Sequence, residues 1–424
     1  MKFFEVEGIS KGFLSGIFIL KIFFGLLLWA IYTFYYTDRS TADIYKYFDD
    51  SKILNDILKT NPIHFFKILL GIGNNAPEFE PYYAQMHFWA RKIDSNIYND
   101  SHTIIRFNSL VRFFSFGYYN VHTVFICFLS LIGLTGIYKT FAIYLQDKKT
   151  ELLFVVFLLP SVLFWGSGVL KEGLIFFALG LLIYHFNKLF STKSIFICIG
   201  VALLLALSKF YVWLAIVPSL LFILWINKSN TSKVFLKFIL VIIVIGAVGL
   251  NIDRFTSIQN PLVTLSQKQM EFNQLASGNL TDANNNPIAV AKSAIKIKTL
   301  EPTLYSFAKN SPQAIINTIF RPYIWELKSP LMLMAGLENL LILGFIFLCL
   351  IFIKPLTVIR WEYVLFCMSF VIIQLLIIGE TTPIIGAIAR YKVPALPFLM
   401  ISFLFMLDKN KLLKRIPIFE KLLR

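Results

Sequence analysis

Charged residues are scarce in this sequence. Only 15% of its 424 residues are Asp, Glu, Lys or Arg, and 57% are hydrophobic. Soluble domains have about 25% charged and about 45 to 50% apolar residues. The composition therefore excludes a soluble globular protein. The hydrophobic residues form runs of roughly 17 to 25, the length of a helix that crosses a bilayer.

Cysteine is also rare, and several common motifs are missing. The four cysteines lie inside hydrophobic runs, without CxxC or Cys/His spacing, so neither a disulfide framework nor a metal site is predicted. The sequence has no GxGxxG, Walker or zinc-protease motif, which argues against nucleotide use. The cofactor is left unknown: a divalent metal is an open alternative, with no clear site.

The hydrophobic runs predict an all-α fold. We expect one membrane domain over residues 1–424, a polytopic transmembrane helix bundle of about ten spans. The expected spans lie near residues 13–36, 119–145, 152–170, 172–189, 194–208, 210–227, 234–250, 331–353, 361–379 and 391–407. Two long polar loops, residues 38–103 and 251–329, interrupt them and carry amphipathic aromatic segments. Such segments are typical of helices at a membrane interface.

The distribution of positive charge predicts the orientation. With an even number of spans, both termini face one side, where the short segments hold 18 Lys or Arg against 7 Asp or Glu. The two long loops hold 15 against 14. Because Lys and Arg in short loops mark the cytoplasmic side, we expect a bacterial inner (cytoplasmic) membrane protein with cytoplasmic termini and two outer loops. The basic tail, residues 408–424, is then cytoplasmic, and the net charge of +16 reflects topology and not nucleic acid binding.

The first outer loop begins with carboxylates that could carry chemistry. Asp43, Asp49 and Asp50 follow the first span closely, and in a helix over residues 42–58 Asp43 and Asp50 share one face. A carboxylate near the membrane surface can act as a general base on an acceptor hydroxyl. The alternative is a solvated, capped helix start.

Isolated basic residues occur in short outer turns, although most Lys and Arg of the short segments lie on the expected cytoplasmic side. Lys171, Lys209 and Arg390 are expected on the outer face. Glu172, which follows Lys171, could support the site by orienting the phosphate that Lys171 holds, or it could only pair with Lys171. Lys offers a point charge and Arg a bidentate contact to phosphate, so the three can hold a donor phosphate. The alternative is that each only anchors its helix among lipid headgroups.

Two further ionisable groups are candidates for supporting roles. Glu338 lies within the eighth expected span, and an ionisable group inside a membrane is a functional candidate by default. Arg321 lies in an aromatic segment of the second outer loop.

The layout resembles the GT-C superfamily of polytopic, polyprenyl-phosphate-dependent membrane glycosyltransferases. Asp43-Ile44-Tyr45 looks like the acidic residue and tyrosine that follow the first helix in that family, with Asp49 and Asp50 as alternatives. The segment 159–172 is similar to a helix pair with a charged outer turn, and residues 390–397 to an Arg-Tyr helix start that contains proline. A clean Asp-Glu or Asp-x-Asp pair and a large soluble C-terminal domain are missing.

The resemblance implies an enzyme that moves a sugar from a polyprenyl-phosphate carrier to a glycan, lipid or protein acceptor on the extracytoplasmic face. Asp43 would be the base, Tyr45 would support it, and Lys171, Lys209 and Arg390 would hold the donor phosphate. The alternatives are a lipid-linked glycan polymerase or O-antigen ligase, a flippase or transporter, and a non-catalytic membrane subunit. A transporter would place charged groups along the middle of several helices, and here such groups are few.

Overall fold

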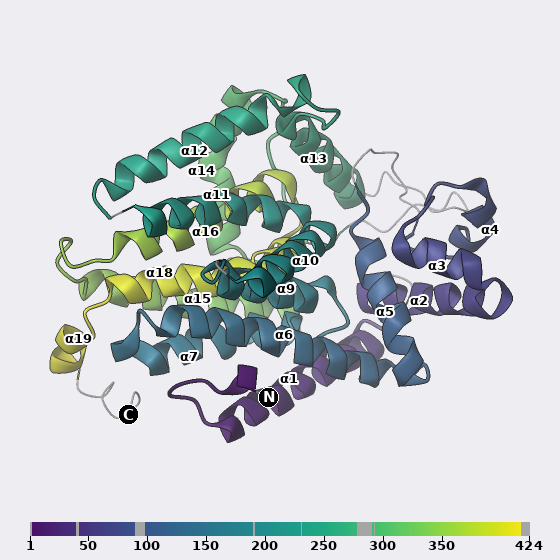
Figure 1. Ribbon diagram of the computed structural model, residues 1–424, viewed down its shortest axis with the longest axis horizontal. Coiled ribbons are helices and arrows are strands. Elements are labelled where there is room, and N and C mark those ends of the chain that lie inside the picture. Colours follow the sequence, from purple (N-terminus) through teal and green to yellow (C-terminus); the bar gives the residue numbers. More distant parts are fainter. Residues whose placement is uncertain are drawn as a thin grey trace. The chain divides into compact units, whose positions relative to one another are not determined.

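The computed structural model of the protein describes residues 2–39, 42–89, 98–189, 191–229, 231–277, 291 and 293–416. Within them the regular secondary structure is helical, apart from isolated β-bridges, so the all-α prediction is confirmed. Figure 1 shows the helices, coloured along the sequence. The chain divides into two compact units. The first comprises Met1–Thr140 and Val162–Phe210, and the second Phe141–Ser161 and Tyr211–Arg424. Of the predicted tail, residues 417–424 lie outside the described part.

Six helical segments among the described residues are long and apolar enough to cross a membrane. This indicates a multi-pass membrane protein. The six segments are Lys11–Tyr35, Tyr119–Ala142, Phe210–Lys228, Pro330–Ile351, Trp361–Thr381 and Ile385–Met406. Two shorter apolar helices are Thr192–Ser208 and Val234–Leu250.

The first unit combines apolar helices with an amphipathic group. Its helices are α1 (Lys11–Ala30), α2 (Asp43–Thr60), α3 (Pro62–Leu70), α4 (Glu80–Tyr83), α5 (Ser101–Ser115), α6 (Tyr119–Ala142), α9 (Lys171–Phe186) and α10 (Thr192–Ser208). The π-helical turn Ile31–Tyr35 continues α1. Helix α2 packs against α3 and α5, burying Leu54 and Ile57 among other residues. Thus the first long polar loop folds into packed helices.

Local sequence signals set the ends of α3. The Asn61 side chain accepts the backbone N–H of His64 at 3.1 Å, and Pro62 occupies the first helical position. Asn is a preferred N-cap, and proline is tolerated at this position because its missing N–H would have no helical partner. Gly71 ends the helix in a left-handed conformation with φ of 78°, which glycine adopts at low cost.

Helices α6 and α9 meet backbone to backbone. A Cβ atom added to Gly180 would lie 1.9 Å from the carbonyl oxygen of Gly133, and one added to Gly133 would lie 1.9 Å from that of Phe176. Small residues allow this close approach, which stabilises helix pairs in membranes through van der Waals packing.

The second unit contains the remaining helices. They are α7 (Lys149–Phe157), α11 (Phe210–Lys228), α12 (Val234–Leu250), α13 (Pro261–Ser277), α14 (Leu304–Phe320), α15 (Pro330–Ile351), α16 (Trp361–Thr381), α17 (Ile385–Tyr391), α18 (Leu396–Met406) and α19 (Lys409–Arg415). Helix α16 packs against α14 and α18. At the α14 contact, a Cβ atom on Gly379 would lie 2.2 Å from the Ala314 carbonyl oxygen. Helices α13 and α14 occupy the second long polar loop.

The expected span over residues 152–170 is not one continuous helix. The chain forms α7, which ends at Phe157, and the short helix α8 (Pro160–Trp165). Proline at position 160 lacks an N–H and disfavours helical conformation in the preceding residue. The Glu338 carboxylate of α15 accepts the backbone N–H of Ser161 at 2.9 Å, so Glu338 satisfies an amide at the start of α8.

The last expected span, residues 391–407, also differs from the structure. Helix α17 begins earlier, at Ile385, and a 3-10 turn at Val393–Ala395 separates it from α18. Pro394 and Pro397 account for the interruption, because each removes one helical hydrogen bond.

The close contact between α6 and α9 predicts that a single added methyl group lowers the stability of the fold. Gly180→Ala should lower the free energy of unfolding by about 1–3 kcal/mol, the usual cost of overpacking. Gly200→Ala on α10 is the matched control, because a Cβ atom there meets nothing within 4 Å; it should be neutral or stabilising. Thermal unfolding of the purified protein in detergent checks both, and equal melting temperatures would contradict the close packing.

Candidate functional site

One carboxylate in the first unit joins two of the predicted phosphate-binding lysines. The Lys171 ammonium lies 2.9 Å from Oδ1 of Asp100, and the Lys209 ammonium lies 2.9 Å from Oδ2. The side chains of the two lysines are 8% and 11% exposed, and that of Asp100 is 26% exposed. The cluster is thus nearly buried, and Asp100 is its most open member.

Three separate chain segments bring this cluster together. Asp100 directly precedes α5, Lys171 is the first residue of α9, and Lys209 follows the end of α10. The Thr103 hydroxyl of α5 donates to the Leu207 carbonyl oxygen of α10 at 2.8 Å. This bond holds the start of α5 against the end of α10, and so fixes Asp100 beside Lys209.

Helix α2 borders the same cluster. The Lys171 ammonium lies 5.3 Å from the centroid of the Tyr47 ring, a cation–π contact. Asp43, the first residue of α2, is half-buried and precedes Tyr47 by four residues, so the two share one helix face about 5 to 6 Å apart at Cβ. The face of α2 that carries Asp43 therefore borders the Lys171 side of the cluster.

Asp50 lies further along α2 and anchors the backbone. Its two carboxylate oxygens accept the N–H groups of His87 and Phe88, each at 2.8 Å. Burial raises the pKa of Asp50, and the two backbone hydrogen bonds oppose that rise. The Phe88 ring lies 5.1 Å from the Tyr47 ring. Asp50 thus fixes the backbone at His87 and Phe88, and the Phe88 ring packs against Tyr47 on α2. This role of Asp50 is structural.

The residues around Asp100 are tied to the same stretch of chain. The Asn99 carboxamide donates to the carbonyl oxygens of Phe88 and Trp89 at 2.7 and 3.1 Å. His102 Nε2 lies 2.8 Å from the Trp89 carbonyl oxygen, and the two rings stack at 4.0 Å. Because a carbonyl oxygen only accepts, Nε2 carries the proton. Asn99 and His102, on either side of Asp100 in the sequence, are therefore both hydrogen-bonded to the segment 88–89.

The other predicted residues of the first unit have different surroundings. Asp49 forms an ion pair with Arg39, from Nη2 to Oδ1 at 2.6 Å, and both side chains are solvent-accessible. The Tyr45 hydroxyl forms a hydrogen bond with the Thr33 hydroxyl, and the Arg39 guanidinium lies 4.0 Å from the centroid of the Tyr45 ring. Glu172, the second residue of α9, is 4% exposed.

Arg390, Arg321 and Glu338 belong to the second unit. Arg390 lies in the last turn of α17 with its guanidinium 5.2 Å from the Tyr391 ring centroid. Arg321 forms an ion pair with Glu326 at 2.9 Å. Glu338 binds the Ser161 amide. Of the three predicted phosphate ligands, the structure brings Lys171 and Lys209 together.

Sequence reasoning missed Asp100 and Lys392. Asp100 stands in an Asn-Asp-Ser sequence before α5, which is typical of an N-cap, yet its side chain makes no capping bond. Lys392 is 3% exposed and donates to the Asn339 side chain and to the Thr318 carbonyl oxygen, both at 2.9 Å. The sequence feature that could have identified Lys392 is its position, two residues after Arg390 and directly before a Val-Pro turn.

A metal centre was left open by the sequence. In the described part of the chain, no group of three or more His, Cys, Asp or Glu side chains is placed to hold a metal ion.

No protein-family model, no curated protein and no solved structure matches this chain.

The two neighbouring carboxylates of α2 predict contrasting variants. Asp50→Asn should lower the free energy of unfolding by about 1–3 kcal/mol, because the amide nitrogen would face a backbone N–H that loses its acceptor. Asp49→Asn should cost less than about 1 kcal/mol, since its ion pair is solvent-accessible. Thermal unfolding measures both effects, and equal losses would contradict the anchoring contact of Asp50.

The pH dependence gives a second readout of Asp50. A carboxyl group whose pKa is raised in the folded state contributes stability below its ordinary pKa, and that contribution is lost as pH rises through the raised value. The difference in stability between the natural protein and Asp50→Asn should therefore widen as pH falls toward the ordinary Asp pKa.

Proposed function

We propose that the chain is an integral membrane glycosyltransferase that moves a sugar from a polyprenyl-phosphate carrier to an acceptor on the extracytoplasmic face. One observation carries the proposal: Lys171 and Lys209 converge on a single oxyanion, next to the face of α2 that bears Asp43. Cations and a carboxylate on one surface are the groups that this reaction requires.

The two lysines are assigned to the donor phosphate. Asp100 places both ammonium groups within hydrogen-bonding distance of the two oxygens of one anion, a spacing that also suits two oxygens of a phosphate. Cations held in place before the reaction stabilise the charge that develops on the leaving phosphate. In the absence of donor, Asp100 keeps the two cations close together in a nearly buried place, where unpaired charges would be costly.

Asp43 is assigned as the general base. The carboxylate accepts the proton of the acceptor hydroxyl, the hydroxyl oxygen bonds to the anomeric carbon, and the bond from that carbon to the phosphate oxygen breaks. The phosphate oxygen keeps the electron pair, so the polyprenyl phosphate leaves as an anion, and the configuration inverts. The positive end of the α2 dipole favours the ionised form of a carboxylate in the first turn.

The membrane topology is part of the proposal. Four shorter segments join the six long apolar helices as further passes: α7 with α8, α9, α10 and α12. This gives about ten spans, with both termini cytoplasmic and the loops 38–103 and 251–329 outside. Labelling of single cysteines in the two loops from the outer side tests it.

The base assignment predicts a large kinetic effect. Asp43→Asn removes the proton acceptor at nearly constant size, so turnover should fall by roughly 10² to 10⁴-fold. Asp56→Asn is the matched control on the same helix, because Asp56 pairs with Lys59 at the surface. A transfer assay with lipid-linked sugars extracted from membranes measures both. Equal turnover in the two variants would remove Asp43 from the mechanism.

The phosphate assignment predicts a loss of binding. Lys171→Met and Lys209→Met should each weaken the affinity for polyprenyl phosphate by about 10- to 100-fold, the range of a charged hydrogen bond. Lys59→Met is the control, since Lys59 is exposed and paired with Asp56. Titration of the protein in nanodiscs with polyprenyl phosphate measures the change. Unchanged affinity in both variants would show that the cluster only stabilises the fold.

A further inference from the structure

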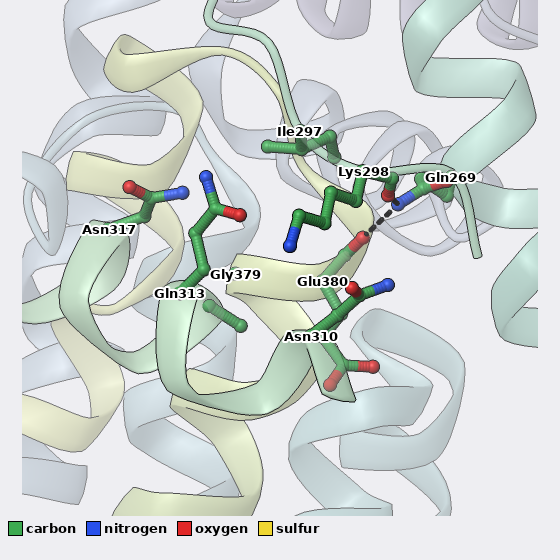
Figure 2. A pocket seen from close by; sticks show the side chains of 9 residues that line it. Gln269, Ile297, Lys298, Asn310, Gln313, Asn317, Gly379 and Glu380 are labelled. Atoms are coloured by element: carbon green, nitrogen blue, oxygen red, sulfur yellow. Dashed lines mark hydrogen bonds between the residues drawn. The ribbon is translucent and has the colours of Figure 1, made fainter. Parts of the chain in front are cut away.

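Buried polar groups in the second unit hold helices together. Figure 2 shows one example, in which the Gln269 amide nitrogen donates to the carbonyl oxygens of Glu380 and Lys298 at 2.7 and 2.9 Å. The hollow beside these bonds has room for about one water molecule, so it does not admit a larger ligand. The cluster of Asp100, Lys171 and Lys209 in the first unit differs, because its anion is a side chain that another anion could replace.

Asp100 occupies the position that the proposed function gives to a phosphate. Each of its carboxylate oxygens lies 2.9 Å from one ammonium group, Oδ1 from Lys171 and Oδ2 from Lys209. The two lysine side chains are 8% and 11% exposed, which leaves little of either ammonium open to a second anion. The carboxylate and a bound phosphate therefore exclude each other from the two cations.

Contacts outside the carboxylate hold the two lysines in place. Lys209 follows the last residue of α10, and its backbone N–H donates to the Leu205 carbonyl oxygen at 2.8 Å. The Lys171 ammonium lies 5.3 Å from the centroid of the Tyr47 ring. Because these contacts do not involve Asp100, the pair of cations remains when the carboxylate moves away.

The start of α5 does not depend on the Asp100 carboxylate. The preceding residue, Asn99, accepts the N–H of Ser101 on its side chain and that of His102 on its carbonyl oxygen, both at 3.1 Å. The Asp100 side chain makes no capping bond. It is 26% exposed, so a carboxylate that leaves the lysines reaches water, and the positive end of the α5 dipole favours a carboxylate there.

We propose that Asp100 is an internal competitor for the phosphate of the lipid carrier. It leaves Lys171 and Lys209 before the phosphate binds, and it competes for them again once the polyprenyl phosphate product has formed. A phosphate monoester carries about 1.5 to 2 negative charges at pH 7, so two cations alone would hold the product strongly. This inference rests on the proposed function and adds to it a means of product release.

Removal of the competitor should tighten the binding of a prenyl phosphate. An observed affinity is lowered by the fraction of molecules in which the site is open. Charged hydrogen bonds to two lysines should keep that fraction at roughly 1 to 10%, so Asp100→Asn should bind farnesyl phosphate about 10- to 100-fold more tightly than the natural protein does. Titration of the full-length proteins in nanodiscs measures both affinities. Asp56→Asn is the matched control and should bind as the natural protein does, because Asp56 pairs with Lys59 at the surface.

Inorganic phosphate is the second probe, because it distinguishes a lipid headgroup from a free anion. A gain in affinity for farnesyl phosphate, with or without a gain for inorganic phosphate, supports the proposal. A gain for inorganic phosphate alone would overturn it, since the cluster would then not take a lipid-linked product.

A double variant tests whether the gain comes from the lysines. When Asp100→Asn is combined with Lys171→Met, the tighter binding of farnesyl phosphate should disappear, because one of the two cations is lost. A gain that persists in the double variant would overturn the proposal by showing that Asp100 acts away from the cluster.

Thermal unfolding separates competition from a structural role of the carboxylate. Without phosphate, Asp100→Asn leaves two nearly buried cations close together and should melt below the natural protein. Farnesyl phosphate should raise the melting temperature of Asp100→Asn by more than that of the natural protein, because a ligand that binds more tightly stabilises the folded state more. If the variant stays destabilised in farnesyl phosphate, or fails to fold when prepared with it, a phosphate cannot take the place of the carboxylate and the proposal is overturned.

The same measurements distinguish this inference from the proposed function. If Lys171→Met weakens the binding of farnesyl phosphate while Asp100→Asn does not strengthen it, the competition is excluded and the transferase proposal remains. If Asp100→Asn strengthens binding but the natural protein transfers no sugar, the competition is established and the transferase proposal fails.

Discussion

The pairing of buried charge joins distant segments of this protein, because an ionised group removed from water costs several kcal/mol unless it is paired. Three charged groups meet this need in different ways. Asp100 shares its two oxygens between two lysines, and Asp50 uses its oxygens on two backbone amides. Lys392 donates to a carbonyl oxygen and a carboxamide. These contacts join segments far apart in the sequence, so satisfying the charges also fixes the tertiary structure.

Much of the architecture was predictable from hydrophobic runs, since a helix that crosses a bilayer must be apolar for about 20 residues. The runs at the start of the chain and at 331–353 gave helices within a few residues of their expected ends. The failures have a local cause. Pro160 and Pro394 interrupt helices inside runs that are largely apolar, and hydropathy alone does not register a missing backbone donor.

Of the candidate site, Lys171, Lys209 and Asp43 were named from the sequence, and Asp100 was missed. Lys171 and Lys209 were identified because each is a cation in a very short turn between two apolar runs. The roles of the carboxylates depend on partners that no local pattern shows. Asp49 and Asp50 are adjacent, yet one pairs with Arg39 in solvent and the other binds amides 37 and 38 residues later. Asp100 resembled an ordinary helix start until α9 and α10 supplied its two cations.

The order of the chain gives the Asp100 cluster a consequence for biosynthesis. Lys171 follows Asp100 by 71 residues and Lys209 follows it by 109. A ribosome adds about 5 to 20 residues per second, so the carboxylate is made several seconds before its second cation. Until Lys209 has been made, Asp100 lacks its second cation, and the contacts of α5 with α10 cannot yet be complete. The N-terminal helices therefore acquire their final arrangement only after the later apolar helices have been inserted.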